Sequence, residues 1–368
     1  MVTLPLFLIW SNMPANAHPA IGKRPRRFRK GCHVRFHSRA RLAGQRTLFL
    51  ALAVLLLAAG REAKAGDAVA TSSVAQKNAP PGMTRGQAAV LGLVEGLTEY
   101  LPVSSTGHLL LAQHVMGIAK SGGDPSTEQE RRKQAADAYA ICIQAGAILA
   151  VLGLYLRRIR QMVIGLMGKD RAGLNMVVNI AAGFVPAAVI GLLFESSIKR
   201  YLFGLRPVVA AWFVGGVAIL ALAWWQEKRP EQSRPAKPLE ELTCKMALIV
   251  GFAQCVAMWP GVSRSLITIV GGLLVGLSMS AAVEFSFLLG MVTLSAATGY
   301  DALKHGRIMF QIYDPLSMTT GFVVAFVSAV LSVKWMVSYL NRHGLSLFGY
   351  YRVGIATVVG TLILISVL

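Results

Sequence analysis

Apolar segments close to the thickness of a lipid bilayer fill the chain from residue 85 onward. The 368 residues are 54% hydrophobic and only 15% charged, and the mean hydropathy is +0.55. Lipid admits only helices and closed barrels, because every backbone polar group needs an internal partner there. We therefore expect an all-α integral membrane protein, with apolar segments at 86–116, 138–156, 175–194, 208–225, 244–277, 281–299, 316–337 and 348–368.

Two of these segments are longer than one span and are interrupted in the middle. Segment 86–116 contains LPVSSTG and segment 244–277 contains WPGVSRS, each with a proline, a glycine and several hydroxyl side chains. Irregular backbone at membrane depth is tolerated only where protein or a water-filled cavity surrounds it. We interpret both segments as re-entrant helical hairpins. The expected architecture is a polytopic helical bundle in which each hairpin is followed by three spans, giving six spans in total.

An odd number of spans makes the second half cross the membrane in the opposite direction to the first. The predicted halves, about 86–225 and 244–368, therefore form an inverted repeat. Broken helices at matching positions of inverted halves indicate a site near the midplane, where the two hairpin tips meet. Secondary transporters share this plan, so a transporter or flippase is the rival to an enzyme.

Residues 1–65 have the order of a secretory signal. A basic region containing KRPRRFRK precedes the apolar run 48–59, and Ala63-Lys64-Ala65 follows as a small-x-small cleavage site. The basic region is unusually long, so the segment is either signal-like or an extension from a misassigned start, and an uncleaved anchor helix is the alternative. Residues 66–84 are expected to be a flexible lead-in, and the membrane domain to occupy 85–368.

The net charge of +20 does not indicate a nucleic-acid-binding protein. Residues 1–65 hold twelve Lys and Arg against the single acid Glu62, which accounts for +11 of that charge. The remainder has no basic stripe with interleaved aromatic residues, so no nucleic-acid partner is expected. The four cysteines form no CxxC pair, and we expect neither a disulfide framework nor a zinc site.

Loop charges favour one orientation of the chain in the membrane. If residue 66 lies outside, the loops 157–171 and 226–245 lie inside with five Lys and Arg each, as the positive-inside rule prefers. The outside loop 119–137 still carries four basic residues, so the bias is modest.

Two glutamates precede the first interruption. Glu95 and Glu99 are four residues apart, so on a helix they share one face. Two carboxylates that close in a low dielectric repel, so either one keeps a proton or a cation lies between them. A divalent cation such as Mg²⁺ or Ca²⁺ fits the pair, particularly if a phosphate supplies the remaining oxygens. The alternative is a protonated pair with a structural role.

A hydroxyl cluster lies where the first broken helix restarts. Ser104, Ser105 and Thr106 are followed by Gly107 and His108. Free backbone N–H groups at a helix start form an anion site, and the hydroxyls add donors. His108 stands three residues after Ser105, so it can serve as the base for a serine nucleophile. A plain N-cap beside a buried histidine would have the same sequence.

The second interruption carries a cation between hydroxyl groups. Arg264 lies between Ser263 and Ser265, and Thr268 follows four residues later. An arginine at membrane depth needs an anionic partner, and its planar guanidinium matches two phosphate oxygens at once. A structural ion pair with Glu99 is the alternative.

Three stretches, EGLTEYLPVSSTGHLLLA (95–112), PGVSRSLITIVGGLLVG (260–276) and EFSFLL (284–289), resemble the undecaprenyl-diphosphate phosphatase family. This is the bacitracin-resistance type of integral membrane phosphatase, and the likeness covers most of the chain. The sequence departs from the family pattern at Leu266 and Ile267, where glycine and alanine are common, and in its long N-terminal extension.

The resemblance implies hydrolysis of the terminal phosphate of C55 undecaprenyl diphosphate. This reaction regenerates the monophosphate carrier for bacterial cell-wall synthesis and gives bacitracin resistance. The family also implies dependence on a divalent cation, a multi-pass protein of the bacterial inner membrane, and an active site towards the periplasm. The expected partners are the C55 lipid substrate and the bilayer, and a homodimer is compatible with the sequence.

Carried onto this sequence, the family's first motif falls on Glu95, Glu99, Ser105 and His108, and its second on Ser263, Arg264 and Thr268. The expected mechanism is displacement at the terminal phosphorus by Ser105, with His108 as base and Arg264 stabilising the equatorial oxygens. Glu95 and Glu99 are the expected metal ligands, and Glu99 also counts among the catalytic residues. Attack by His108 or by a metal-bound water is the alternative. The expected substrate-binding residues are Ser104, Thr106, Gly107, Ser263, Ser265 and Thr268.

Overall fold

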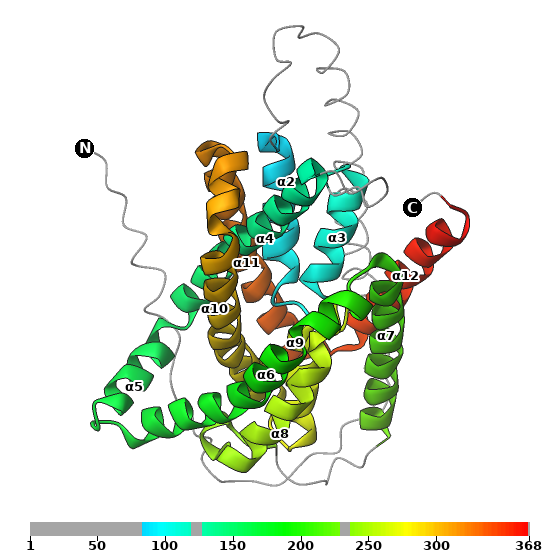
Figure 1. Ribbon diagram of the computed structural model, residues 1–368. Coiled ribbons are helices and arrows are strands. Elements are labelled where there is room, and N and C mark those ends of the chain that lie inside the picture. Colours follow the sequence, from blue (N-terminus) through cyan, green and yellow to red (C-terminus); the bar gives the residue numbers. More distant parts are fainter. Residues whose placement is uncertain (1–82, 119–126, 229–235, 367–368) are drawn as a thin grey trace, which may run out of the picture. The chain divides into compact units, whose positions relative to one another are not determined.

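The computed structural model describes residues 83–118, 127–228 and 236–366 (Figure 1). In these ranges the chain forms α-helices, two short 3-10 helices, and one isolated bridge between Lys237 and Leu277. The prediction of an all-α protein is confirmed for this part of the chain. The signal-like segment 1–65 and all but the end of the lead-in lie outside the described residues.

The first broken helix opens the described chain. α2 (Arg85–Thr98) and α3 (Ser105–Val115) are separated by the turn 99–104 and pack against each other. α2 begins with a capping box, because the Thr84 hydroxyl accepts from the Gln87 N–H and the Gln87 side chain accepts from the Thr84 N–H. The end of the predicted lead-in therefore belongs to the folded domain.

The helices that follow are α4 (Thr127–Leu154), α5 (Leu156–Leu166), α6 (Arg171–Leu202) and α7 (Leu205–Glu227). α5 is bent by 78° from the apolar part of α4. Its Arg158 forms ion pairs with Glu284 (2.6 Å) and Glu240 (3.1 Å), and these contacts hold α5 against later elements of the chain.

The second half repeats the pattern of a broken helix followed by long helices. A short 3-10 helix, η1 (Leu239–Glu241), precedes it. The broken helix consists of α8 (Cys244–Gln254), the 3-10 turn η2 (Cys255–Met258) and α9 (Arg264–Leu274). The long helices are α10 (Met279–Ile312), α11 (Pro315–His343) and α12 (Ser346–Leu364).

Five of the described helices are long and apolar enough to cross a membrane, namely α6, α7, α10, α11 and α12. α4 and α5 meet the same condition only together, as a bent pair, and would make a sixth span. Exposed apolar side chains on α6 suit contact with lipid, since Leu192 is 66% and Leu193 is 71% exposed. α9 and the α8–η2 segment are apolar but shorter.

Helices from the two halves pack against each other throughout. Figure 1 shows α11 beside α2 and α12 beside α7, and α4 also packs on α10 and α11. Glycines permit the closest approaches: a Cβ added at Gly92 would lie 2.3 Å from the Gly321 carbonyl oxygen, and one at Gly251 would lie 2.5 Å from that of Gly183. Small residues at such crossings let helix backbones touch. The site between the broken helices is therefore framed by both halves.

Candidate active site

The two breaks, residues 99–104 between α2 and α3 and residues 255–263 between α8 and α9, share one unusual backbone conformation. Ser104, the N-cap of α3, has φ 77° and ψ 104°, and Ser263, the N-cap of α9, has φ 69° and ψ 112°. Positive φ is uncommon for residues other than glycine and persists only where the surrounding structure determines it. The matching angles show that the chain turns in the same way at both breaks.

The two breaks also meet in space, as the sequence predicted. The Ser265 hydroxyl donates to the Leu101 carbonyl (2.9 Å), and the Ser263 hydroxyl donates to the same oxygen (3.4 Å). A salt bridge joins Arg264 Nη2 to Glu99 Oε1 at 3.3 Å. Side chains of Ser263 and of the first turn of α9 thus hold the Leu101 carbonyl and the Glu99 carboxylate of the first break in place.

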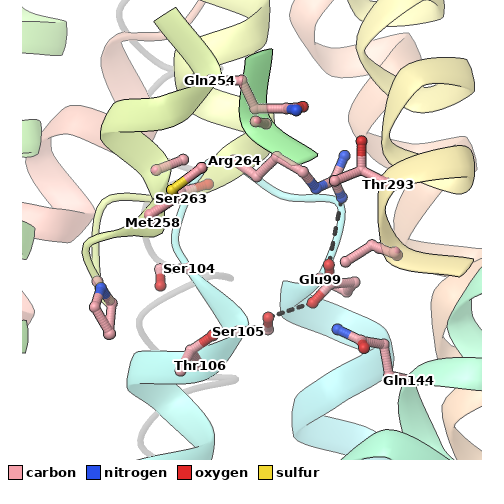
Figure 2. A pocket seen from close by; sticks show the side chains of 15 residues that line it. Glu99, Ser104, Ser105, Thr106, Gln144, Gln254, Met258, Ser263, Arg264 and Thr293 are labelled. Atoms are coloured by element: carbon pink, nitrogen blue, oxygen red, sulfur yellow. Dashed lines mark hydrogen bonds and ion pairs between the residues drawn. The ribbon is translucent and has the colours of Figure 1, made fainter. Parts of the chain in front are cut away.

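A pocket of about 270 Å³ opens between the breaks (Figure 2). Its polar lining comes from the turn 99–104, from Ser263, and from α3, α4, α8, α9 and α10. Ala187, Ala257, Met258 and Leu294 add apolar wall. Among the predicted site residues, the ones that line it are Glu99, Ser104, Ser105, Thr106, Ser263 and Arg264.

Glu99 is the centre of the polar network. Its Oε2 accepts a short hydrogen bond from the Ser105 hydroxyl, and its Oε1 receives the Arg264 guanidinium. Figure 2 shows both contacts as dashed lines. The side chains of Glu99 and Arg264 are only 5% and 11% exposed, so water screens this pair weakly. A hydroxyl, a carboxylate and a guanidinium are therefore already connected.

Glu95 is buried, at 1% exposure, and does not line the pocket. Its carboxyl group interacts with that of Glu99 and, electrostatically, with Arg264, and no other described residue donates a hydrogen bond to its oxygens. No cluster of three or more metal-ligating side chains occurs in the described ranges. Two carboxylates alone fit an ion of the Mg²⁺ type, which takes its other ligands from substrate phosphates and water.

The ring nitrogens of His108 are hydrogen-bonded to groups other than the Ser105 hydroxyl, in contrast to the predicted pair of nucleophile and base. Its Nδ1 lies 2.6 Å from the Ser104 carbonyl oxygen and its Nε2 lies 2.7 Å from the Tyr351 hydroxyl. A carbonyl only accepts, so Nδ1 carries a proton and donates to the Ser104 carbonyl. When the ring is neutral, Nε2 accepts from the Tyr351 hydroxyl. The ring also packs against Trp212, with centroids 4.9 Å apart. Contacts with α7 and α12 therefore turn it away from the serine.

Arg264 is seated against α10. Its Nη1 donates to the Ser286 carbonyl (3.4 Å), and its guanidinium carbon lies 5.5 Å from the centre of the Tyr100 ring. Gly290 provides the space, because a Cβ there would fall 1.6 Å from Arg264 Nη1. No pattern in the sequence singles out Gly290, since the contact depends on how α9 and α10 pack.

Three predicted substrate-binding residues lie outside the pocket lining. Gly107 packs against α7, where an added Cβ would lie 2.5 Å from Trp212. Ser265 and Thr268 are fully buried, and the Thr268 hydroxyl donates to the Arg264 carbonyl (2.9 Å). Their contacts hold the second break in shape.

A residue that the sequence interpretation missed joins both breaks. Arg352 of α12 is fully buried and donates to the carbonyls of Pro102 (3.4 Å), Ala211 (2.9 Å) and Gly261 (2.7 Å). Pro102 belongs to the first break and Gly261 to the second. The signal that could have found it is an arginine inside an apolar segment, which at membrane depth indicates a specific partner.

Comparison with known proteins adds to this geometry. The sequence matches the family described as bacitracin resistance protein BacA over residues 88–358, which include both breaks and α12 up to Val358. An undecaprenyl-diphosphatase of Sorangium cellulosum is 42% identical over 273 residues, which are 74% of this chain and 84% of that protein. Undecaprenyl-diphosphatase 2 of Rhodospirillum rubrum is 44% identical over 74% of this chain and 93% of its own length. An undecaprenyl-diphosphatase of Nitrosomonas europaea is 42% identical, with coverages of 74% and 92%.

Proposed function

The chain belongs to the bacitracin resistance protein BacA family, and from this premise we propose that it hydrolyses undecaprenyl diphosphate to undecaprenyl phosphate and inorganic phosphate. Such a hydrolase recycles the lipid carrier for cell-wall synthesis and gives resistance to bacitracin. The supporting observation is the contact of Glu99 with both Ser105 and Arg264 in one pocket. Nucleophile, proton acceptor and charge stabiliser are the groups that displacement at phosphorus needs.

In the proposed reaction, Ser105 Oγ attacks the terminal phosphorus and Glu99 accepts the hydroxyl proton through the existing hydrogen bond. A carboxylate serves the same purpose in kinases, where an aspartate accepts the proton of the attacking hydroxyl. The bond from the terminal phosphorus to the bridging oxygen breaks, and the lipid monophosphate leaves with the electron pair. Water then hydrolyses the phosphoserine, Glu99 returns its proton to Ser105 Oγ, and inorganic phosphate is released. Arg264 stabilises charge on the equatorial oxygens.

His108 has a positioning role in this scheme. Its hydrogen bond to the Ser104 carbonyl supports the left-handed turn that starts α3. That turn places Ser105 at the first position of the helix, where backbone N–H groups and the hydroxyls of Ser104 and Thr106 can receive phosphate oxygens. Glu99 thus replaces His108 as the proposed base.

Glu95 and Glu99 are the proposed ligands of a divalent cation, Mg²⁺ or Ca²⁺. The burial of the Glu95 carboxyl group beside that of Glu99 supports this assignment. When bound, such an ion would neutralise charge on the diphosphate.

We also propose the membrane arrangement predicted above. The apolar part of α4, from Ala138 to Leu154, is the sixth span, and the two broken helices are re-entrant hairpins related as an inverted repeat. The pocket opens towards the periplasm from the inner membrane. The matching angles of Ser104 and Ser263 support the repeat, and the basic inner loops support the orientation.

Phosphate release from C55 undecaprenyl diphosphate by the purified protein tests the function. We expect turnover that is lost on chelation and restored by Mg²⁺ or Ca²⁺, and a fall in kcat on the order of 10³-fold or more in Ser105→Ala. Ser197→Ala, the same change at an exposed position of α6, should retain parental turnover. With substrate labelled in its terminal phosphate, the label should transfer to the parent protein but not to Ser105→Ala.

The rival function of a flippase or transporter is not favoured, because the relatives are named as diphosphatases and the Ser105 hydroxyl in the pocket is already hydrogen-bonded to the Glu99 carboxylate. A transporter would move the intact diphosphate without releasing phosphate. Absence of phosphate release from folded protein with metal present would therefore overturn the proposal.

A further inference from the structure

Gln254, at the end of α8, is a buried amide without a partner in the wall of the pocket. Its side chain is 3% exposed, and neither Oε1 nor Nε2 has a hydrogen-bond partner among the described residues. Arg264 Nε, from the same pocket wall, is likewise unpartnered there. Buried polar atoms are nearly always hydrogen-bonded, so unmade bonds grouped at one pocket point to a ligand that completes them.

The position of Gln254 in the repeat explains which kind of ligand it suits. Gln254 stands nine residues before Ser263, just as Glu95 stands nine residues before Ser104. The first half thus places a carboxylate, which suits a cation, where the second half places an uncharged amide. Amide N–H groups donate to anions, whereas a carboxylate at position 254 would repel them.

The place of Gln254 in the pocket indicates which part of the diphosphate it meets. Figure 2 shows Gln254 at one end of the pocket lining and Ser105 towards the other, with the side chain of Arg264 between them. In phosphoryl transfer the leaving oxygen departs roughly in line with, and opposite to, the attacking oxygen. Attack by Ser105 therefore puts the lipid-linked phosphate on the side of Gln254.

We propose that Gln254 Nε2 and Arg264 Nε bind the lipid-linked phosphate of the substrate, while Ser105 and the first break receive the terminal phosphate. This inference rests on the proposed function and deepens it. The pocket then has a separate subsite for each phosphate. The product undecaprenyl phosphate keeps the lipid-linked phosphate, so it still binds at the Gln254 subsite after the reaction.

Product inhibition tests this assignment directly. Gln254→Met removes the donor at similar length, and Gln254→Glu replaces it with an acceptor. We expect KM and the inhibition constant of undecaprenyl phosphate to rise together by about ten-fold or more in Gln254→Met, and further in Gln254→Glu. The inhibition constant of inorganic phosphate should stay parental, because inorganic phosphate forms from the terminal phosphate and binds at the subsite beside Ser105.

Gln161→Glu on α5 adds the same charge away from the pocket and should match the parent in all three constants. Thermal unfolding in detergent identifies variants that fail to fold, and either folded Gln254 variant alone is sufficient for the comparison. The inference is wrong if KM and the undecaprenyl phosphate constant stay within about two-fold of the parent, or if both inhibition constants rise alike. A parent that releases no phosphate defeats the proposed function itself, whereas an active parent with unchanged Gln254 variants defeats only this inference.

Discussion

At the scale of single residues, the guanidinium of Arg264 occupies space that is open only because residue 290 is a glycine. Gly290 and Gly299 both lie inside α10, but only Gly290 faces the guanidinium, and an added Cβ at Gly299 would meet nothing within 4 Å. The same substitution at the two glycines therefore separates an effect on Arg264 from an effect on helix stability.

We predict that Gly290→Ala lowers kcat by about 10²- to 10³-fold, the loss typical when one preorganised donor is displaced. The clash falls on the end of a flexible side chain, so the protein should still fold. Gly299→Ala should keep parental kcat and gain up to about 1 kcal/mol of helix stability. The checks are kcat with the C55 substrate and thermal unfolding, and parental kcat in Gly290→Ala would remove Arg264 from the reaction.

The residue scale also shows where sequence reasoning succeeds and where it stops. Buried charges and hydroxyls in an apolar chain need partners, and together with the two broken helices this requirement predicts that the polar groups of both interruptions converge. The direct ion pair of Glu99 with Arg264 was the alternative to a phosphate partner for Arg264. The partner of His108 is not predictable in the same way. A spacing of three residues places His108 near Ser105 along the helix, but Tyr351, 243 residues later, decides which way the ring faces.

At the scale of elements, α12 acts on the site without touching the pocket. Arg352 spans carbonyls of both breaks and of α7, and Gly215 leaves room for it, since an added Cβ would lie 2.4 Å from Arg352 Nη2. A planar guanidinium directs several donors at fixed angles, which a lysine ammonium on a flexible stem does not.

We predict that Arg352→Lys lowers both thermal stability and kcat, because at least one break loses its donor. An unsatisfied buried carbonyl costs about 1–3 kcal/mol, and the misplaced breaks should reduce kcat by at least about ten-fold. Arg342→Lys, at an exposed position in the last turn of α11, is the matched control. Unchanged melting and turnover in Arg352→Lys would show that the breaks hold their shape without α12.

The two breaks are predictable as elements, whereas the bend after α4 is not. A run of proline, glycine and hydroxyl residues inside an apolar segment strongly favours an interrupted helix, so both interruptions were predicted with nearly correct bounds. The interpretation of 157–171 as a plain loop missed α5. The arginines of this segment favoured a loop, but its apolar residues Ile159, Met162 and Leu166 recur every three to four positions, as in a helix. The ion pair of Arg158 with Glu284 depends on tertiary packing and leaves no local signal.

At the scale of the whole molecule, the proposed orientation places the ends of α10 and α5 on opposite sides of the membrane. Leu303 is 90% exposed near the end of α10, and Lys169 is exposed after α5. In a variant without its native cysteines, Leu303→Cys should react with an impermeant thiol reagent added to whole bacteria with a permeabilised outer membrane, and Lys169→Cys should not. Disrupting the inner membrane should expose both, and the reverse labelling pattern would invert the topology.

The carbonyls of Leu101 and Pro102 find their donors on Ser265 and Arg352, far later in the chain. Synthesis runs from the N-terminus at roughly 5–20 residues per second, so the ribosome makes the first break before it makes either donor residue. The Leu101 carbonyl can therefore gain its donor only after α9 has been made, and the Pro102 carbonyl only after α12 has been made. A chain that stops before α12 would contain Glu99, Ser105 and Arg264, but it would lack the donor that joins the carbonyl of Pro102 to that of Gly261.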